Sequence, residues 1–301
     1  MDQQLPIESL AKSIKQVFID ADKYPMDKHV PSFRVDGTFL GDCFNYTIVE
    51  PVEGKPPIFY HTYSPYDVVS HKAPDQALIF QDGALLLNAD FAGYVSQRTG
   101  VMSALVLQAL GVTTLADKKF LMVGTGAIAQ CALRALKALY PDLAACAFMN
   151  SGSEASDFIA LADKLGISCT RGTIGAIQEY DYIICHSAAT QPVLTAEMCT
   201  RIKPGAVIAS FVSEDKVELA PEFYDAEHAN VLIDWDQTIK DSPELNEAVT
   251  RTIANPERII RLRELFNGSA ILKPDAQYTV YRSHGTPMQN LAVLKLLLAA
   301  R

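Results

Sequence analysis

The chain has 301 residues, of which 49% are hydrophobic and 20% are charged, and its formal net charge is −9. A chain of this length and composition can bury one large core or two smaller ones, which excludes a disordered protein. Its lysines and arginines do not gather into a basic run that could follow a phosphate backbone, so we expect no nucleic-acid partner.

No segment of the sequence is typical of export or membrane anchoring. Residues 1–18 are acidic and polar and then amphipathic, unlike a signal peptide. The most apolar stretch, residues 291–300, has about half the ~20 residues that a membrane span requires, and it contains Lys295. We therefore expect a soluble, cytoplasmic protein with no membrane partner.

The six cysteines lack the spacing of zinc ligands. This predicts that they are small buried side chains and that the protein binds no metal.

The two ends of the chain predict one mixed domain. A helix is expected over residues 7–21, then strands rich in aromatic and β-branched residues between turn signals, then a helix over residues 103–110. The end of the chain returns to this style, with a strand over residues 278–281, a glycine turn and a helix over residues 286–300. We predict a discontinuous α+β domain built from residues 1–112 and 276–301.

Residues 113–275 predict an inserted domain of a different kind. Helical patterns such as residues 127–139 and 154–165 alternate with short apolar runs at 120–123, 145–149, 182–185, 207–211 and 231–233. Strands that are hydrophobic on both faces and alternate with helices indicate a parallel sheet covered on each side. The predicted fold class is therefore α/β, with a doubly wound parallel sheet of Rossmann type inserted into the α+β domain.

Gly124-Thr125-Gly126 follows the first apolar run directly, and an amphipathic helix follows it. This context is typical of a dinucleotide-binding turn: Gly124 allows the tight turn, Gly126 leaves room for a pyrophosphate, and Ala129 lets the helix pack on the sheet. The alternative is a strand, turn and helix without a ligand.

Further residues at the strand ends are predicted to line the same dinucleotide. After the second strand the chain reads Asn150-Ser151, with no carboxylate before Glu154 and no adjacent arginine. Such small polar residues accept a 2′-phosphate better than an aspartate would, which favours NADP slightly over NAD. The complete set of cofactor-binding residues that we predict is Thr99, Gly124, Thr125, Gly126, Ala127, Ile128, Asn150, Ser151, Ser187, Ala188 and Val212.

Several stretches together resemble the ornithine cyclodeaminase/mu-crystallin family. They are Arg98-Thr99 followed by Ser103-Ala104-Leu105, the Gly124-Thr125-Gly126 turn, RIKPGAVIASF at residues 201–211, and YTVYRSHGTPMQNLAVLKLLLAA at residues 278–300. The resemblance implies a Rossmann domain joined to a substrate-binding domain that also forms a homodimer. It also implies NAD(P)-linked chemistry on amino acids or cyclic imines, as in the family's cyclodeaminases, alanine dehydrogenases and ketimine or pyrroline-carboxylate reductases.

The resemblance assigns Arg98 to the substrate carboxylate, which a planar guanidinium can bind in bidentate fashion. Ser283 and Gly285 match the closing motif, and we expect them to border the substrate. His284 between them has no counterpart in the family. His186, after the fourth strand, either lines the pocket or caps the strand.

The chain departs from the family at its catalytic groups. The family carries a lysine where this chain reads PPIFYHTYSPYD, residues 56–67, without a lysine. His61, Tyr60 or Tyr63 stands near that place; His61 could donate a proton, although ordinary packing is the alternative. The family's acidic residue after the fifth Rossmann strand falls in a second departure, because residues 211–219 keep the tail of the family motif in a shortened form. Asp215, with Glu214 beside it, is the candidate acid there; a solvated loop charge is the alternative. The catalytic candidates are therefore Asp215 and His61.

These observations predict an NAD(P)-dependent oxidoreductase that acts on a carbon–nitrogen bond, reducing a cyclic imine or ketimine carboxylate or oxidising an amino acid. Cyclodeamination with loss of ammonia is the alternative within the enzymes. A protein that binds NADP or a small molecule without turnover, like mu-crystallin, is the alternative from another class.

Overall fold

The computed structural model describes residues 4–29, 32–35, 38–65, 76–150, 152, 155–187, 189–211 and 216–301. Contacts within the chain divide it into two compact units. Unit 1 consists of Met1–Arg98 and Pro287–Arg301, and unit 2 is Thr99–Thr286. In the described residues no helix is both long and apolar enough to cross a membrane.

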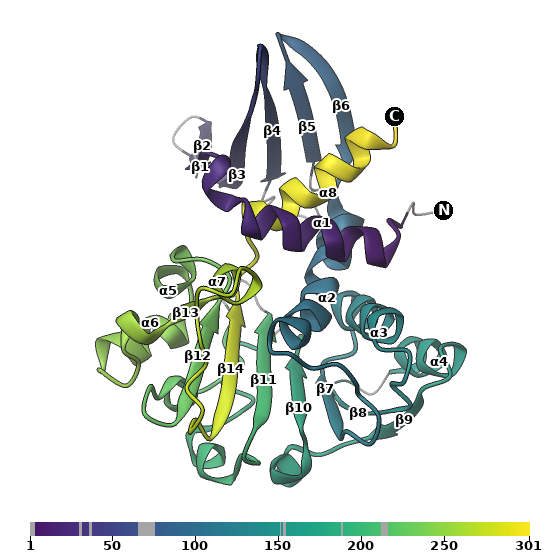
Figure 1. Ribbon diagram of the computed structural model, residues 1–301, viewed down its shortest axis with the longest axis vertical. Helices are drawn as coiled ribbons and strands as arrows, with labels where there is room; N and C mark the ends of the chain where they lie inside the picture. The colour runs from purple at the N-terminus through teal and green to yellow at the C-terminus, as the bar shows by residue number, and fades with distance from the viewer. Residues whose placement is uncertain are drawn as a thin grey trace. The chain divides into compact units, whose positions relative to one another are not determined.

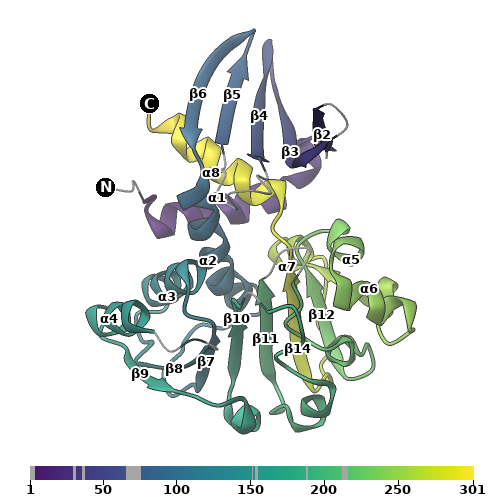
Figure 2. The ribbon, with the colours of Figure 1, turned by 180° about the vertical axis from the view of Figure 1, so that it is seen from behind.

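Unit 1 is an antiparallel sheet with helices against one face (Figures 1 and 2). The strands are β1 (Met26–His29), β2 (Ser32–Val35), β3 (Thr38–Val52), β4 (Lys55–Pro65), β5 (Gln76–Gln81) and β6 (Ala84–Asp90). Their order is β1-β3-β4-β5-β6, and β2 pairs with β3. The helices are α1 (Ile7–Ile19), the short η1 (Ala21–Lys23) and α8 (Pro287–Ala299).

The core of unit 1 lies between this sheet and its helices. Helix α1 buries a stripe of apolar residues, Leu10, Ala11, Ile14, Val17 and Phe18, and it packs along α8. Ile48, Tyr60 and Ile79 on adjacent strands are at most 2% exposed. Because side chains alternate along a strand, one face of the sheet carries these residues and the other face carries their neighbours in sequence.

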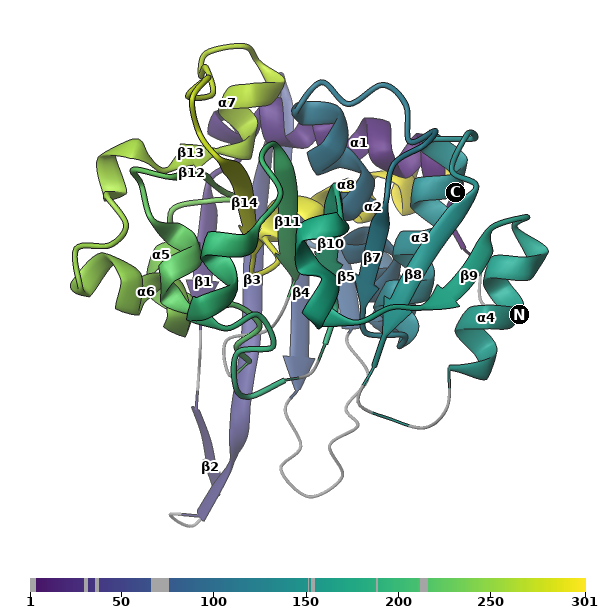
Figure 3. The same cartoon turned by 90° about the horizontal axis from the view of Figure 1, so that it is seen from below.

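Unit 2 is an eight-stranded sheet in which every pair of neighbours is parallel. The strand order is β13-β12-β14-β11-β10-β7-β8-β9, which Figure 3 shows from one side of the sheet to the other. The strands are β7 (Phe120–Val123), β8 (Ala145–Met149), β9 (Ser168–Arg171), β10 (Tyr182–Cys185), β11 (Ala206–Phe211), β12 (Ala229–Ile233), β13 (Ile260–Arg261) and β14 (Tyr278–Ser283). Every residue of β7, β10, β11, β12 and β14 is buried, as expected for strands covered on both faces.

Helices connect the parallel strands. They are α3 (Ala127–Leu139), α4 (Ser156–Lys164), α5 (Gln237–Asp241), α6 (Pro243–Thr250) and α7 (Leu262–Phe266), with 3₁₀ turns η2 (Ile174–Glu179), η3 (Ala196–Arg201), η4 (Pro221–Tyr224) and η5 (Pro256–Arg258). From β7 the chain moves outward through β8 to β9, then returns to β10 on the other side of β7. This reversal between β7 and β10 is the topological switch point where doubly wound sheets bind ligands.

The predicted fold class is confirmed, and the largest differences from the predicted elements concern one helix and the C-terminal segment. Helix α2 (Ala92–Ala109) begins eleven residues before the expected residue 103. The predicted C-terminal segment of the first domain, residues 276–301, is divided: β14 pairs with β11 and β12, whereas α8 packs with α1. The burial of β14 on both faces explains its place in the parallel sheet. The domain boundaries at residues 112/113 and 275/276 stay a prediction.

Candidate functional site

The turn between β7 and α3 contains two glycines with different requirements. Gly124 has a φ of +100°, and a Cβ atom at this position would lie 2.3 Å from the carbonyl oxygen of His186. Only glycine fits there. Gly126 has an ordinary φ of −71°, and a Cβ atom would meet no described atom within 4 Å. The fold of the protein therefore does not require glycine at position 126, which instead keeps the space above the turn clear.

The helix that follows the turn presents its positive end to this space. Helix α3 begins at Ala127, directly after Gly126, and no described side chain caps it. The first N–H groups of a helix have no acceptor within the helix, and they attract anions. Ala127 is exposed and Ile128 is half-buried. An open glycine and an uncapped helix start fit the pyrophosphate of a dinucleotide.

Small residues let α2 and α3 approach closely beside the turn. A Cβ atom at Gly100 of α2 would lie 2.6 Å from the backbone nitrogen of Ala132 in α3. Thr99, a predicted cofactor residue, precedes this contact and is 8% exposed. This close packing requires a residue without a side chain at position 100 of α2.

The neighbouring strands supply polar groups on each side of the turn. The N–H of Gly124 donates to the carbonyl of Met149 over 2.8 Å, which ties the turn to the end of β8. Asn150 follows, and its side-chain amide donates to the hydroxyl of Thr125 at 3.3 Å. On the other side, the N–H of His186 donates to the carbonyl of Val123 over 2.7 Å. The structure thus brings the predicted turn, Asn150 and the segment after β10 together.

The side chain of His186 contacts Ser103 on α2 and Phe211 on β11. Its Nε2 lies 3.0 Å from the hydroxyl of Ser103, and its ring stacks on Phe211 with centroids 4.8 Å apart. Burial lowers the pKa of its imidazole to about 3. A neutral ring held in this way packs against Ser103 and Phe211, and both alternatives that the sequence left open for His186 stay predictions.

Glu218 is a fully buried carboxyl group at the same edge of the sheet. It accepts hydrogen bonds from the N–H of Ser187 at 2.5 Å and from the hydroxyl of Ser210 at 2.7 Å. Burial raises the pKa of Glu218 to about 7, although these hydrogen bonds and the charge of Arg282 oppose the shift. Glu218 therefore holds the predicted cofactor residue Ser187 by its backbone. Sequence reasoning did not single out Glu218.

The raised pKa of Glu218 predicts a pH-dependent stability. Between the usual pKa of 4.5 and about 7, the native state keeps a proton that the unfolded chain releases. The free energy of unfolding should therefore fall as pH rises through this window, by up to about 1.4 kcal/mol per pH unit from this group. Urea unfolding at pH 5, 6, 7 and 8 should show this slope, and Glu218→Gln should remove its contribution. The exposed control Glu197→Gln should keep the wild-type dependence of the free energy of unfolding on pH. The same dependence in Glu218→Gln would contradict the assignment of this effect to Glu218.

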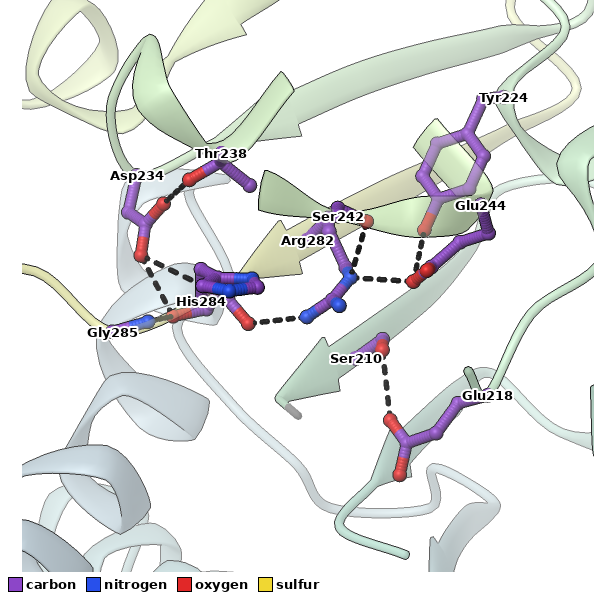
Figure 4. A network of polar contacts seen from close by, with 11 residues as sticks. Ser210, Glu218, Tyr224, Asp234, Thr238, Ser242, Glu244, Arg282, His284 and Gly285 are labelled. Atoms are coloured by element: carbon purple, nitrogen blue, oxygen red, sulfur yellow. Dashed lines mark hydrogen bonds and ion pairs between the residues drawn. The ribbon is translucent and has the colours of Figure 1, made fainter. Parts of the chain in front are cut away.

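A second buried network occupies the ends of β12 and β14 (Figure 4). Asp234, directly after β12, accepts hydrogen bonds from the hydroxyls of Ser283, at 2.8 Å, and Thr238. The N–H of Gly285 donates to the Ser283 hydroxyl at 3.3 Å, and Gly285 has a φ of +78°. The predicted substrate residues Ser283 and Gly285 are thus linked to each other and to Asp234, which sequence reasoning missed.

Arg282, on β14, is a buried residue that forms hydrogen bonds with three neighbouring residues. Its Nε donates to Glu244 at 2.5 Å and to the hydroxyl of Ser242 at 3.0 Å, and its Nη1 donates to the carbonyl of Ser283 at 2.6 Å (Figure 4). The side chains of Arg282 and Glu244 are 0% and 1% exposed. A buried ion pair of this kind, in which Arg282 donates further hydrogen bonds to its neighbours, fixes the end of β14.

Arg98 lies in the part of α2 that belongs to unit 1. The side chain is half-buried, and its Nη1 donates to the side-chain oxygen of Gln289 on α8. Gln289 is fully buried. This contact orients the guanidinium toward α8.

His61 lies in the middle of the unit 1 sheet. Its Nδ1 lies 3.0 Å from the hydroxyl of Thr47 on β3. Its neighbour Thr62 accepts a hydrogen bond from Asn290 on α8, at 3.2 Å, so Thr62 faces α8. Because side chains alternate along β4, His61 is on the face opposite α8, the helix that carries the partner of Arg98.

Tyr60 shares the face of Thr62. Its hydroxyl donates to Glu50 at 2.5 Å, and Glu50 also pairs with Lys295 of α8. Burial raises the pKa of Tyr60, which excludes its phenolate near neutral pH.

The side chain of Tyr63 lies outside the described part of the structure. So do four predicted site residues, Ser151, Ala188, Val212 and Asp215, together with Glu214.

The described cysteines Cys131, Cys146, Cys169, Cys185 and Cys199 are free thiols. In the part of the chain that the structure describes, no group of three or more His, Cys, Asp or Glu side chains is placed to hold a metal ion.

The strand order and the turn at the switch point define a Rossmann-type α/β protein. A model of the ornithine cyclodeaminase/mu-crystallin family matches residues 79–299. The chain belongs to this family. No curated protein sequence matches the chain.

Solved structures share the fold over nearly the whole chain. The Δ¹-pyrroline-2-carboxylate reductase of Thermococcus litoralis, in complex with NADH and L-proline, is 17% identical with a TM-score of 0.78, covering 99% of this chain and 94% of that one. The iminosuccinate reductase of Paracoccus denitrificans, in complex with NAD⁺, is 18% identical with a TM-score of 0.79, covering 98% and 92%. An archaeal alanine dehydrogenase dimer with bound NAD is 20% identical with a TM-score of 0.77, covering 98% and 91%.

Proposed function

We propose that the protein is an NAD(P)-dependent oxidoreductase that reduces the carbon–nitrogen double bond of a cyclic imine or ketimine carboxylate. The observation that carries this proposal is the turn after β7, where Gly126 keeps open the space in front of an uncapped helix. Family membership supports it, and so do the names of the similar structures, two of which are imine reductases with NADH or NAD⁺.

The residues of unit 2 bind and orient the dinucleotide in this proposal. The backbone N–H groups at the start of α3, in Ala127 and Ile128, receive the pyrophosphate, and Thr125 adds a hydroxyl. Asn150 is assigned to the adenosine ribose, since it follows the second strand of the fold. Thr99, Ser151, Ser187, Ala188 and Val212 complete the proposed set. When bound, the nicotinamide supplies the hydride.

Arg98 is proposed to bind the carboxylate of the substrate. Its guanidinium has a permanent charge, a planar pair of donors for a carboxylate, and a direction set by Gln289. Binding the carboxylate fixes which face of the imine carbon receives the hydride. Ser283 and Gly285 remain the proposed border of the substrate.

Two residues are candidates for protonating the nitrogen, Asp215 and His61. The location of His61 on the sheet face opposite α8 separates it from the helix that positions Arg98. This separation favours Asp215 of the two. Both assignments stay proposals, and substitution of each by asparagine or glutamine, followed by pH–rate profiles, distinguishes them.

Arg98→Ala should lower kcat/KM for a cyclic imine acid by roughly 10- to 150-fold, because a charge-assisted hydrogen bond contributes about 1.5–3 kcal/mol. The kcat/KM of Arg98→Lys should lie between those of Arg98→Ala and the wild type, since lysine keeps the charge and loses the planar pair of donors. The assay is the loss of nicotinamide absorbance at saturating cofactor. NADPH affinity should stay within about twofold, because no cofactor contact is removed. Equal activity in Arg98→Ala and wild type would exclude the proposed role.

A binding protein without turnover is the second candidate, and one sequence observation favours it. No lysine occurs in residues 56–67, where the family carries one in contact with the substrate. Tight dinucleotide binding with no absorbance change for any cyclic imine, keto acid with ammonia, or diamino acid would support this candidate over the enzyme.

The assembly that we propose is a homodimer formed through the unit 1 sheet. On the face opposite α8, Phe59 and Leu85 are 40% and 52% exposed, and Phe80 lies between them in the strand register. A row of exposed apolar side chains on a sheet fits a partner of the same kind.

A further inference from the structure

The carboxyl ends of β7, β8 and β9 lie next to one another and carry a connected set of polar groups. The strands are parallel and adjacent in this order, so their ends share one edge of the sheet. β7 leads into the glycine turn, β8 is followed by Asn150, and β9 ends at Arg171. In the pairing of β8 with β9, Phe148 is opposite Arg171.

Hydrogen bonds connect Arg171 to the glycine turn through Asn150. The Nη2 of Arg171 donates to the side-chain oxygen of Asn150 at 3.4 Å, and the amide nitrogen of Asn150 donates to the Thr125 hydroxyl at 3.3 Å. The guanidinium carbon of Arg171 also lies 5.7 Å from the centre of the Phe148 ring. These two contacts hold the guanidinium beside Asn150.

The charge of Arg171 is available to a ligand. The residue is exposed, and within the described part of the chain it forms no ion pair. Its hydrogen-bond partner Asn150 is neutral. An exposed guanidinium without a carboxylate partner can bind a phosphate with two parallel hydrogen bonds.

The position of this pair is the one that distinguishes NAD from NADP in a Rossmann fold. The 2′ position of the adenosine ribose lies at the end of the second strand, where a carboxylate binds the 2′-hydroxyl of NAD and a nearby arginine accommodates the 2′-phosphate of NADP. Here the second strand, β8, ends at an amide, and the neighbouring strand supplies the arginine.

We propose that Arg171 is a specificity-determining residue that binds the 2′-phosphate of NADP, and that Asn150 positions it. The inference rests on the proposed dinucleotide site. It makes the protein selective for NADP(H) over NAD(H), since only NADP(H) carries a phosphate on the 2′ oxygen of the adenosine ribose for the guanidinium to bind.

The test is calorimetric titration of NADPH and NADH into the wild type, Arg171→Ala and Arg171→Lys. The wild type should bind NADPH more tightly than NADH. Arg171→Ala should weaken NADPH binding by about 10- to 150-fold, the range of a charge-assisted hydrogen bond, and should leave NADH binding within about twofold of the wild type. The NADPH affinity of Arg171→Lys should lie between those of the wild type and Arg171→Ala. Lys164→Ala, which removes one exposed positive charge at the end of α4, should change neither affinity beyond about twofold.

Asn150→Asp gives an opposite test at the same place. A carboxylate at position 150 would pair with Arg171 and repel a 2′-phosphate, so NADPH binding should weaken while NADH binding is kept or improved.

Each other outcome of the titrations overturns the inference. Equal weakening of NADPH and NADH by Arg171→Ala would mean that Arg171 only stacks on the adenine. Unchanged NADPH binding would mean that it lies away from the ligand. In both cases the proposed function stands, whereas a wild type that binds neither dinucleotide would overturn the proposed function together with this inference.

Discussion

Gly126→Ala should fold with the stability of the wild type and lose dinucleotide binding, whereas Gly124→Ala should lose stability as well. A Cβ atom at Gly126 meets no described atom within 4 Å, and φ there is −71°, so the apo-protein accepts alanine. The same methyl group occupies the space where a pyrophosphate must approach the backbone, and NADPH affinity should fall by at least 100-fold.

At Gly124 the added methyl group has no space even without a ligand. It would lie 2.3 Å from the His186 carbonyl oxygen, and the residue has a φ of +100°. We expect a loss of several kcal/mol in the free energy of unfolding, because the neighbouring atoms are backbone and cannot move aside easily. Urea unfolding and calorimetric titration measure both quantities on the same samples.

Gly93→Ala is the matched control for this pair. Gly93 lies in α2, its φ is not positive, and a Cβ atom there would meet nothing described within 4 Å. Alanine should leave binding unchanged and raise stability by about 0.4–1 kcal/mol. Wild-type dinucleotide affinity in Gly126→Ala would show that the turn does not hold the pyrophosphate.

Arg282→Met should lower the free energy of unfolding by about 3–5 kcal/mol, the largest effect that we expect from a substitution outside the glycine turn. The change removes the bonds from Arg282 to Glu244, Ser242 and the Ser283 carbonyl and leaves Glu244 buried without its charge partner. Urea unfolding without added dinucleotide is the measurement.

A surface arginine provides the control for Arg282. Arg251 forms ion pairs with Glu222, at 2.9 Å, and Glu247, at 3.0 Å, but all three side chains are substantially exposed. Arg251→Met should therefore cost about 0–1 kcal/mol. The double variant Arg282→Met/Glu244→Leu should recover most of the loss, since neither charge of this ion pair is then left buried without its partner. Equal losses for Arg251→Met and Arg282→Met would contradict the account of the buried network.

The sequence predicts the parts of the fold that depend on local pattern. The parallel sheet follows from apolar runs such as those of β7 and β10, which are buried throughout. The glycine turn is likewise local: the strand, Gly124, Gly126 and the helix are contiguous, so the chemistry of the turn is readable from neighbouring residues.

The parts that the sequence did not predict depend on strand register. Arg171 is 21 residues from Asn150 in the chain, and β9 is mostly exposed, so no apolar run marks it as a strand. The sequence therefore shows no arginine next to Asn150, although the pairing of β9 with β8 provides one. His61 lies among aromatic residues whose alternation does not reveal which face of the sheet is covered; α8, more than 220 residues away, decides that.

Asp234 is another residue whose role could not be predicted from the sequence. It directly follows a run that was expected to be a strand, so its place at the carboxyl edge of the sheet could have been inferred. Its partners Ser283 and Thr238 come from β14 and α5, and β14 was expected to belong to the other domain. Its interaction with Ser283 is apparent only when β14 lies beside β12.

The most direct measurement is a calorimetric titration of NADPH and of NADH into the purified protein. We predict saturable binding with one site per chain and a higher affinity for NADPH. No saturable heat with either dinucleotide, in protein whose unfolding transition shows it to be folded, would contradict the central claim that the turn after β7 holds a dinucleotide.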